Sequence, residues 1–132
     1  MTTEDNKAII HKWIEAWMRA DLSSIEKIFA QNYTVNGVLI GIEGVKQAVK
    51  FLHSAFMDMS FELNEMVAEE DKVVARWKVR GMHIGEFMGV PPTRKQLELH
   101  GINIYRIVDG KIATNHEETN IPEVIQRLKM SN

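Results

Sequence analysis

The chain has 132 residues, a length that suits one domain with a single hydrophobic core. Its 16 basic and 18 acidic residues give a formal net charge of −2, so no overall electric field favours nucleic acid or an anionic membrane. Cysteine is absent, which excludes disulfides, thiolate nucleophiles and sulfur-rich zinc sites. No two histidines are close enough in sequence to suggest a pair of metal ligands, and we expect neither a metal nor a cofactor.

The chain shows no sign of membrane targeting or of internal division. It contains no run of about 18 apolar residues, and its first residues lack the basic segment leading into an apolar one that marks a secretory signal. No repeat, low-complexity tract or linker divides the sequence. We therefore expect one cytoplasmic domain over residues 1–132 that binds neither nucleic acid nor membrane.

The first part of the chain predicts three helices and one strand. Residues 4–20 carry apolar side chains at helical spacing, and Asp21 can cap a second, shorter helix. Residues 32–39 predict a strand. Residues 43–56 have the clearest helical pattern, with one apolar face made by Val45, Ala48, Val49, Leu52 and Phe56.

The apolar pattern changes from helical to alternating after Asp58. Strands are predicted over residues 60–69, 72–82, 96–108 and 111–119, followed by a short helix over residues 121–128. Helices followed by a meander of strands are typical of an α+β fold and not of alternating parallel units.

The two central strands differ in the composition of their faces. In residues 72–82, apolar side chains such as Trp77 alternate with basic ones, so this strand should have one buried face and one solvent-exposed face. Residues 96–108 are apolar on both faces, because Ile102 and Ile104 lie opposite the other apolar side chains of the strand. We expect a second copy of the chain to cover this outer face, which predicts a symmetric homodimer.

Several short motifs follow one another in a recognisable order. They are Gly44-Val45-Lys46, Gly81-Met82-His83, Gly85-Glu86-Phe87, Pro91-Pro92-Thr93, Ile104-Tyr105-Arg106 and Gly110-Lys111-Ile112. With these motifs the chain resembles the SnoaL-like polyketide cyclase family, also described as predicted ester cyclases, within the superfamily shaped like nuclear transport factor 2. The resemblance implies a cone-shaped α+β barrel, in which three N-terminal helices pack against a strongly bent, mixed, mainly antiparallel sheet and leave a pocket at the open end.

The last strand departs from the family pattern Gly-Lys-Ile-x-Glu-His-Trp-x-x-x-Asp, whose Asp is the proposed general acid/base. Read without gaps, the chain has Asn115 at the family His, His116 at the Trp and Asn120 at the Asp. Sliding the chain by one residue would place His116 on the family His, but it would turn every side chain to the opposite face and put Ile121 at the Asp position. We therefore prefer the ungapped reading, in which the Asn120 amide can orient a carbonyl but cannot abstract a proton.

His83, His116 and Asn120 are the candidate catalytic residues. His83 follows Trp77 at even spacing, which places it on the buried face, where an imidazole could act as base or donor; it could equally cap the strand end in water. His116 and Asn120 share a strand face with Ile112, so we expect both to point into the pocket. His116 would then replace the missing base or simply fill space.

Ligand contacts are expected from Tyr33, Phe56, Trp77, Tyr105 and Glu118. The aromatic side chains could stack on a planar ligand, although aromatic residues at such spacing are more often core. Glu118 lies on the same predicted strand face as His116, where burial would raise its pKa; it could equally lie outside the cone in water.

The resemblance implies that the protein binds a small, largely apolar carbonyl compound. If it is an enzyme, the family chemistry is intramolecular aldol cyclisation or a related isomerisation, in which a base removes a proton next to a carbonyl. A donor such as Asn120 or Tyr105 would then stabilise the enolate. Two alternatives stay open: a small-ligand-binding module that has lost the acid/base aspartate, and a catalytically silent dimerisation domain.

Overall fold

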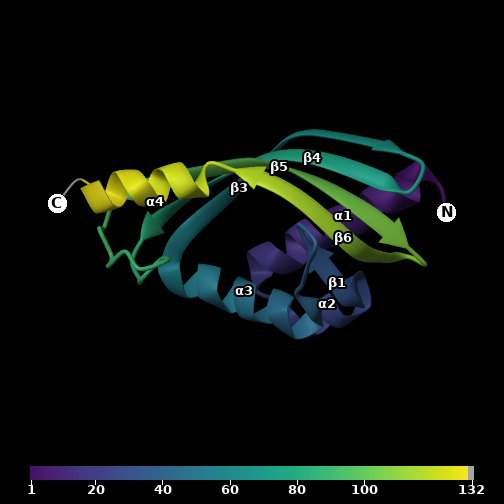
Figure 1. Ribbon diagram of the computed structural model, residues 1–132, viewed down its shortest axis with the longest axis horizontal. Helices are drawn as coiled ribbons and strands as arrows, with labels where there is room; N and C mark the ends of the chain where they lie inside the picture. The colour runs from purple at the N-terminus through teal and green to yellow at the C-terminus, as the bar shows by residue number, and fades with distance from the viewer. Residues whose placement is uncertain (131–132) are drawn as a thin grey trace.

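The computed structural model describes residues 1–130, in which helices lie against one face of a long, curved sheet (Figure 1). In chain order the elements are α1 (Thr3–Arg19), α2 (Leu22–Ile28), β1 (Phe29–Val35), β2 (Val38–Leu39), α3 (Gly41–Ala55), β3 (Phe56–Glu69), β4 (Lys72–His83), β5 (Gln96–Val108), β6 (Lys111–Thr119) and α4 (Ile121–Met130).

The strands form one mixed sheet in the order β2-β1-β6-β5-β4-β3. Strands β1 and β6 run parallel, and the other neighbouring pairs are antiparallel. The edge strands β2 and β3 do not pair, so the sheet stays open. Helices α1, α2 and α3 lie beneath it, while α4 continues beyond the end of β6 (Figure 1). This arrangement confirms the predicted α+β cone, in which three N-terminal helices pack against a mixed sheet.

Local sequence signals explain where the first helices begin and end. The side chains of Thr2 and Asp5 each accept a hydrogen bond from the other's backbone N–H, which forms a capping box at the start of α1. The helix ends at Ala20, which adopts a left-handed conformation. Asp21 then accepts from the Ser24 N–H at the start of α2, as predicted.

The structure corrects two predicted boundaries. The strand expected over residues 32–39 is two shorter strands, because Asn36 and Gly37 both adopt positive φ angles and turn the chain back on itself. Strand β3 begins at Phe56 and not at residue 60, directly after α3. An irregular register between Met57 and Ser60 interrupts its pairing with β4 there, which explains why the alternating pattern becomes readable only later.

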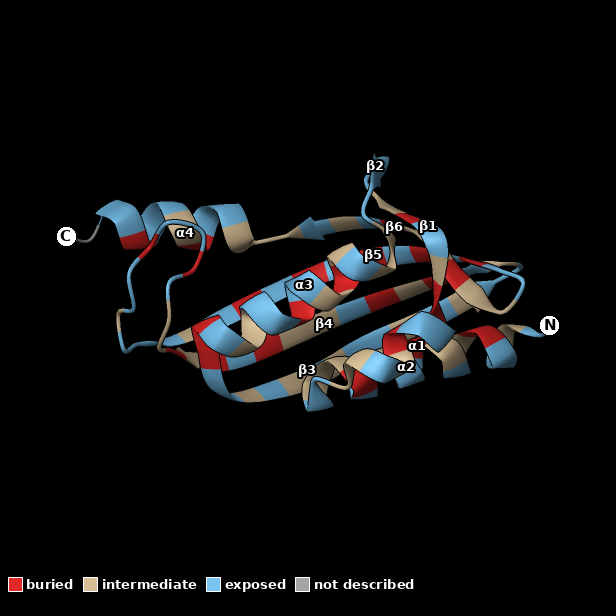
Figure 2. Ribbon diagram, turned by 90° about the horizontal axis from the view of Figure 1, so that it is seen from below, coloured by how far each residue is buried: buried red, intermediate tan, exposed pale blue. Residues whose placement is uncertain are grey.

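The buried hydrophobic residues form two clusters. Figure 2 marks the buried residues in red along the helices and strands. The larger cluster lies where α1, α2 and α3 face the sheet, and it includes Ile10, Ile25 and Val49. The smaller lies toward α4, where Val124 and Leu128 are the buried residues of that helix. The two clusters leave room between the helices and the concave face of the sheet for a pocket.

The opposite, convex face of the sheet carries apolar side chains in water. Ile102 and Ile104 of β5 are 45% and 42% exposed, on the side predicted for a subunit interface. The homodimer itself stays a prediction. Within residues 1–130, no helix combines the length and apolar character needed to cross a bilayer.

Candidate functional site

A pocket of about 410 Å³ lies between the concave face of the sheet and the helices α1 and α3. We call it the cone pocket. Most of its lining is apolar and comes from both the helices and the strands, including Ile10, Trp13, Ile14, Trp17, Val35, Val45, Val49, Leu52, Phe61, Trp77, Val79 and Ile121. An apolar pocket with a few convergent polar groups is the usual form of a small-molecule site.

The polar groups of the cone pocket converge on the two neighbouring strands β5 and β6. Asn103 of β5 pairs in register with Glu117 of β6, and Tyr105 pairs with Asn115. All four residues line the pocket. Because paired residues on adjacent strands share a face, their side chains form one compact polar patch on an otherwise apolar wall.

This polar patch depends on a β-bulge that the sequence did not reveal. Ile107 pairs with Ile112, whereas Arg106 pairs with Thr114, so Ala113 is an extra residue in β6. An extra residue reverses which side chains face inward after it. Ile112 is buried before the bulge and Asn115 is buried after it, although residues three positions apart would face opposite sides of a regular strand.

The bulge corrects the orientation predicted for the last strand. His116 and Glu118 were expected to face the pocket because they share parity with Ile112, but both are exposed. They pair with Ile104 and Ile102 on the convex face of the sheet. Glu117 occupies the inward position that was predicted for its two neighbours.

Asn120 does not face the pocket either. Its Oδ1 accepts a hydrogen bond of 2.8 Å from the His100 N–H, and its Nδ2 donates to the Glu98 carbonyl at 3.2 Å. Its own carbonyl accepts from the Val124 N–H in the first turn of α4. Both ends of the Asn120 amide thus hold the end of β6 to β5, and Asn120 is not among the residues that line the cone pocket. Its predicted contact with a ligand carbonyl stays a prediction.

A chain of hydrogen bonds fixes the polar groups of β4 and β5. The Trp77 indole N–H donates to Asn103 Oδ1 at 3.1 Å, and Asn103 Nδ2 donates to the Tyr105 phenol oxygen at 2.8 Å. The Trp13 indole also donates to that phenol oxygen. Because the Tyr105 oxygen already accepts from two N–H groups, its own O–H hydrogen is left to donate to a ligand.

Gly101 makes this chain possible, because the Trp77 indole lies across it. A Cβ at residue 101 would stand 2.8 Å from Trp77 Cζ2 and 2.7 Å from the Glu118 carbonyl oxygen. Both distances are shorter than van der Waals contact allows. The absence of a side chain at Gly101 therefore lets the indole reach Asn103.

The pocket alters the acidity of its titratable groups. Burial raises the pKa of the Glu117 carboxyl, and a hydrogen bond from Asn115 offsets part of that effect. Burial also raises the pKa of Tyr105 to about 12, against smaller opposing effects of hydrogen bonds from Asn103 and Trp13. Desolvation raises the pKa of Tyr33 in the same way, and the nearby Glu117 charge adds to the rise in both phenols. Both tyrosines are therefore neutral donors at physiological pH.

Three of the predicted ligand contacts, Tyr33, Trp77 and Tyr105, line the cone pocket. The aromatic wall beside them continues into β3 and α1, because the Phe61 ring stacks on Trp77 at 6.5 Å and meets Trp17 edge-on at 5.8 Å. Such a wall suits a flat apolar ligand. Any contact between these residues and a ligand stays a prediction.

Two other predicted residues, Phe56 and His83, do not line the pocket. Phe56 belongs to the smaller hydrophobic cluster, and the His83 ring packs beside it. His83 faces the same side of β4 as Trp77, as expected, but it is fully buried against the rings of Phe56 and Phe87. Its Nδ1 accepts from the Thr93 N–H at 3.2 Å, so the ring proton is assigned to Nε2. His83 thereby holds the loop that follows β4.

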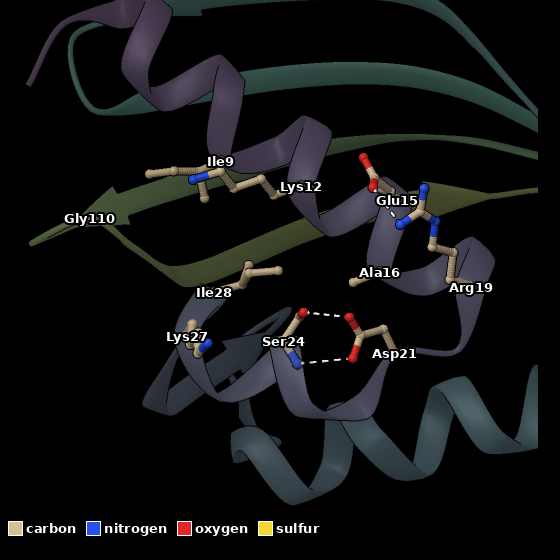
Figure 3. A pocket seen from close by; sticks show the side chains of 10 residues that line it. All are labelled: Ile9, Lys12, Glu15, Ala16, Arg19, Asp21, Ser24, Lys27, Ile28 and Gly110. Atoms are coloured by element: carbon tan, nitrogen blue, oxygen red, sulfur yellow. Dashed lines mark hydrogen bonds and ion pairs between the residues drawn. The ribbon is translucent and has the colours of Figure 1, made fainter.

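A smaller hollow of about 260 Å³ lies between α1 and α2 near the β5–β6 turn (Figure 3). Three of its charged side chains already have partners, since Arg19 pairs with Glu15 and Asp21 accepts a hydrogen bond from the Ser24 hydroxyl. Nowhere in residues 1–130 do three His, Asp or Glu side chains cluster to hold a metal ion. The cone pocket is thus the stronger candidate for a functional site.

Sequence reasoning missed three polar residues of the site. Asn103 could have been found, because it has the same parity as Tyr105 and is a polar residue on a predicted apolar face. Asn115 aligned with the family His, but its parity placed it on the outer face. Glu117 gave no comparable signal, because Ala113 and Thr114 do not identify a bulge.

Comparison with known proteins places this architecture in a family. The sequence profile of the SnoaL-like polyketide cyclases matches residues 7–126. The chain is 27% identical over 117 residues to aklanonic acid methyl ester cyclase DauD of Streptomyces sp. (strain C5), covering 83% of this chain and 72% of that protein. It is 27% identical over 95 residues to nogalonic acid methyl ester cyclase of Streptomyces nogalater, covering 70% of each protein.

Among solved structures, AclR, a candidate hydroxylase from Streptomyces galilaeus, superposes with a TM-score of 0.83 at 29% identity, covering 99% of this chain and 100% of that one. The sequence match spans most of the chain, and the structural match extends over nearly all of it. The chain therefore belongs to the SnoaL-like polyketide cyclase family.

Proposed function

We propose that the protein binds a small, largely apolar carbonyl compound in the cone pocket and catalyses an intramolecular aldol cyclisation or a related isomerisation. The observation that carries this proposal is Glu117, a carboxylate that faces an apolar pocket beside two neutral phenols. A carboxylate with a raised pKa is a stronger base than one in water, and its position in a pocket is typical of an acid/base residue.

In the proposed reaction the Glu117 carboxylate removes a proton from the carbon next to the ligand carbonyl, which forms an enolate. The Tyr105 O–H donates a hydrogen bond to the enolate oxygen, where negative charge develops. For ring closure, the enolate carbon attacks a second carbonyl carbon of the same molecule and forms a C–C bond. The resulting alkoxide takes the proton back from the Glu117 carboxylic acid, which restores the base.

The support comes from the arrangement of the donors as well as from the base. Asn103 and Trp13 both donate to the Tyr105 oxygen, which withdraws electron density from it and makes its O–H a better donor. These groups are held by strand pairing and by the Trp77 hydrogen bond before any ligand binds. Preorganised donors of this kind stabilise a developing charge without reorganising during the reaction.

The proton-abstraction step can be tested without the natural substrate. 2-Tetralone is a flat, apolar ketone with exchangeable protons next to its carbonyl, and its deuterium incorporation in D₂O can be followed by NMR. We expect the native protein to accelerate this exchange, and Glu117→Gln to lower the acceleration by about 100-fold or more, as for loss of a general base. Aklanonic acid methyl ester, the substrate in the name of the relative DauD, is the first compound to test for ring closure.

Two variants separate this assignment from the earlier candidates. His116→Gln changes an exposed residue on the convex face and should leave the exchange rate unchanged. Tyr105→Phe removes the donor but keeps the ring, so the rate should fall while ligand binding persists. Loss of exchange in His116→Gln with full activity in Glu117→Gln would refute the assignment of the base. Binding of 2-tetralone without any exchange would favour the ligand-binding module.

A further inference from the structure

Asn36 binds the backbone of β6 at the point where β1 stops running beside it. Strand β1 ends at Val35, which pairs with Asn115, whereas β6 continues to Thr119. The Asn36 N–H donates to the Asn115 carbonyl at 2.9 Å. Its side-chain Oδ1 accepts from the Glu117 N–H at 3.0 Å, and its Nδ2 makes a longer contact of 3.5 Å with the Glu117 carbonyl. A single residue thus holds β6 where that strand no longer has β1 as a neighbour.

The Asn36 side chain takes the place of a strand neighbour. In a parallel pair, one residue uses its own N–H and C=O to bond the two residues that flank its opposite number. Asn36 uses its N–H in this way, but its φ of 49° turns the chain into the hairpin, and its side-chain carbonyl serves in place of the backbone one. Asparagine meets both demands, because it tolerates the left-handed conformation and its amide both accepts and donates hydrogen bonds. A glycine meets only the first demand, and an aspartate cannot donate.

We propose that Asn36 is a positioning residue for Glu117 and that its amide keeps the Glu117 carboxylate in the cone pocket. Glu117 follows the bulge at Ala113, which decides that its side chain faces inward. Strand β5 pairs with one edge of this part of β6, and Asn36 binds the other edge. Without Asn36 the Glu117 N–H would bond to water, and we expect the carboxylate to move toward solvent. The proposal rests on Glu117 being the base proposed above.

The position of the carboxylate sets its strength as a base. Burial raises the pKa of the Glu117 carboxyl, so a shift toward water would lower that pKa and make the carboxylate a weaker base. A base that is misaligned with the proton it removes also loses rate. The phenols whose charge would couple to Glu117, Tyr33 and Tyr105, have raised pKa values and stay neutral. The acidic limb of a pH–rate profile therefore reports on Glu117.

Asn36→Gly tests the proposal, because it removes the amide but keeps a left-handed turn next to Gly37. In the 2-tetralone exchange assay we expect kcat to fall about tenfold, since the base is misplaced, while KM stays nearly unchanged because the aromatic wall is intact. The acidic limb of the pH–rate profile should move to lower pH. Asn36→Asp keeps the acceptor for the Glu117 N–H and should recover most of the rate. An unchanged kcat and pH profile in Asn36→Gly, or no recovery in Asn36→Asp, would overturn the proposal.

A control variant separates positioning from a simple loss of stability. Asp21→Ala removes the side-chain cap of α2, at a residue that does not line the cone pocket. It should lower the Tm but leave kcat and the pH–rate profile unchanged. If the acidic limb moved in this variant as well, lost stability alone would explain the shift, and the role of Asn36 would be refuted.

Two measurements on Glu117 itself make the test independent of catalysis and of folding. The ¹³Cδ signal of Glu117 should titrate at lower pH in Asn36→Gly than in the native protein, and equal midpoints would contradict the proposal. A native protein that exchanges no 2-tetralone protons would refute the proposed reaction, while this titration would still decide the role of Asn36. If Asn36→Gly does not fold, the Glu117 amide hydrogen of the native protein should exchange slowly with solvent, because Asn36 accepts from it. Rapid exchange of that hydrogen would count decisively against the proposal.

Discussion

Replacing Gly101 by alanine should damage the pocket through a contact that can be worked out atom by atom. The new Cβ would lie 2.7 Å from the Glu118 carbonyl oxygen, 2.8 Å from Trp77 Cζ2 and 2.9 Å from Thr119 Cγ2. The indole and the methyl group can move aside, but the carbonyl belongs to the strand paired with β5 and cannot move without disturbing that pairing.

The expected cost has two parts. Overpacking of this kind costs about 1–3 kcal/mol of unfolding free energy. Displacing the indole also breaks the Trp77–Asn103 hydrogen bond, which adds about 1 kcal/mol. A total of about 2–4 kcal/mol should lower the Tm by roughly 8–16 °C at this chain length. The near-ultraviolet circular dichroism of the tryptophans should change as well.

One control identifies the cause. In a Trp77→Phe background the cost of Gly101→Ala should shrink but not vanish, because the Glu118 carbonyl remains. If the unfolding free energy of Gly101→Ala lay within about 0.5 kcal/mol of the native value and the tryptophan signals were unchanged, the close approach of Trp77 and the Glu118 carbonyl to residue 101 would be refuted.

Three more predictions test other parts of the structure. Burial raises the pKa of Glu117 in the folded protein, so its contribution to folding stability is complete below the unfolded pKa of about 4.3 and is lost as pH rises through the folded pKa. The Tm of Glu117→Gln should therefore rise relative to that of the native protein as pH increases above about 4.3. A difference in Tm that does not change with pH would contradict the raised pKa. His83→Leu should lower the unfolding free energy by about 1–3 kcal/mol in urea titration, because it leaves the Thr93 N–H without its acceptor; no loss would mean that His83 does not hold the loop. Ile104→Lys places a charge on the exposed convex face, so sedimentation velocity should show a monomer in place of the predicted homodimer. A native protein that is already monomeric at micromolar concentration would contradict the predicted interface.

Much of the fold was predictable because local signals agree with the tertiary structure. Apolar spacing located α1 and α3, Asp21 marked the start of α2, and the period-two pattern located β4 and β5 with the correct inward faces. The exposed isoleucines of β5 also followed from parity alone. These features depend on neighbouring residues in sequence, so a single chain suffices to read them.

The candidate site was only partly predictable, for a reason visible in two strands. On β5, which is regular, parity placed Tyr105 in the pocket, and the same reasoning covers Asn103. On β6, one unpaired residue at Ala113 inverted the parity of every later position, so His116 was expected inside and Glu117 outside. A bulge is created by how β6 pairs with its neighbours, and no local preference of Ala113 or Thr114 records it.

The sequence by itself determined the class of fold, the family resemblance and the inward positions of Tyr33, Trp77 and Tyr105, because hydrophobic periodicity is a local property. The tertiary structure alone decided which carboxylate faces the pocket, that Asn120 holds β6 to β5, and that Asn115 keeps an unpaired acceptor. Each of these depends on strand register and on which distant groups meet across the sheet, and a one-residue irregularity in register is enough to exchange the inside and the outside of a strand.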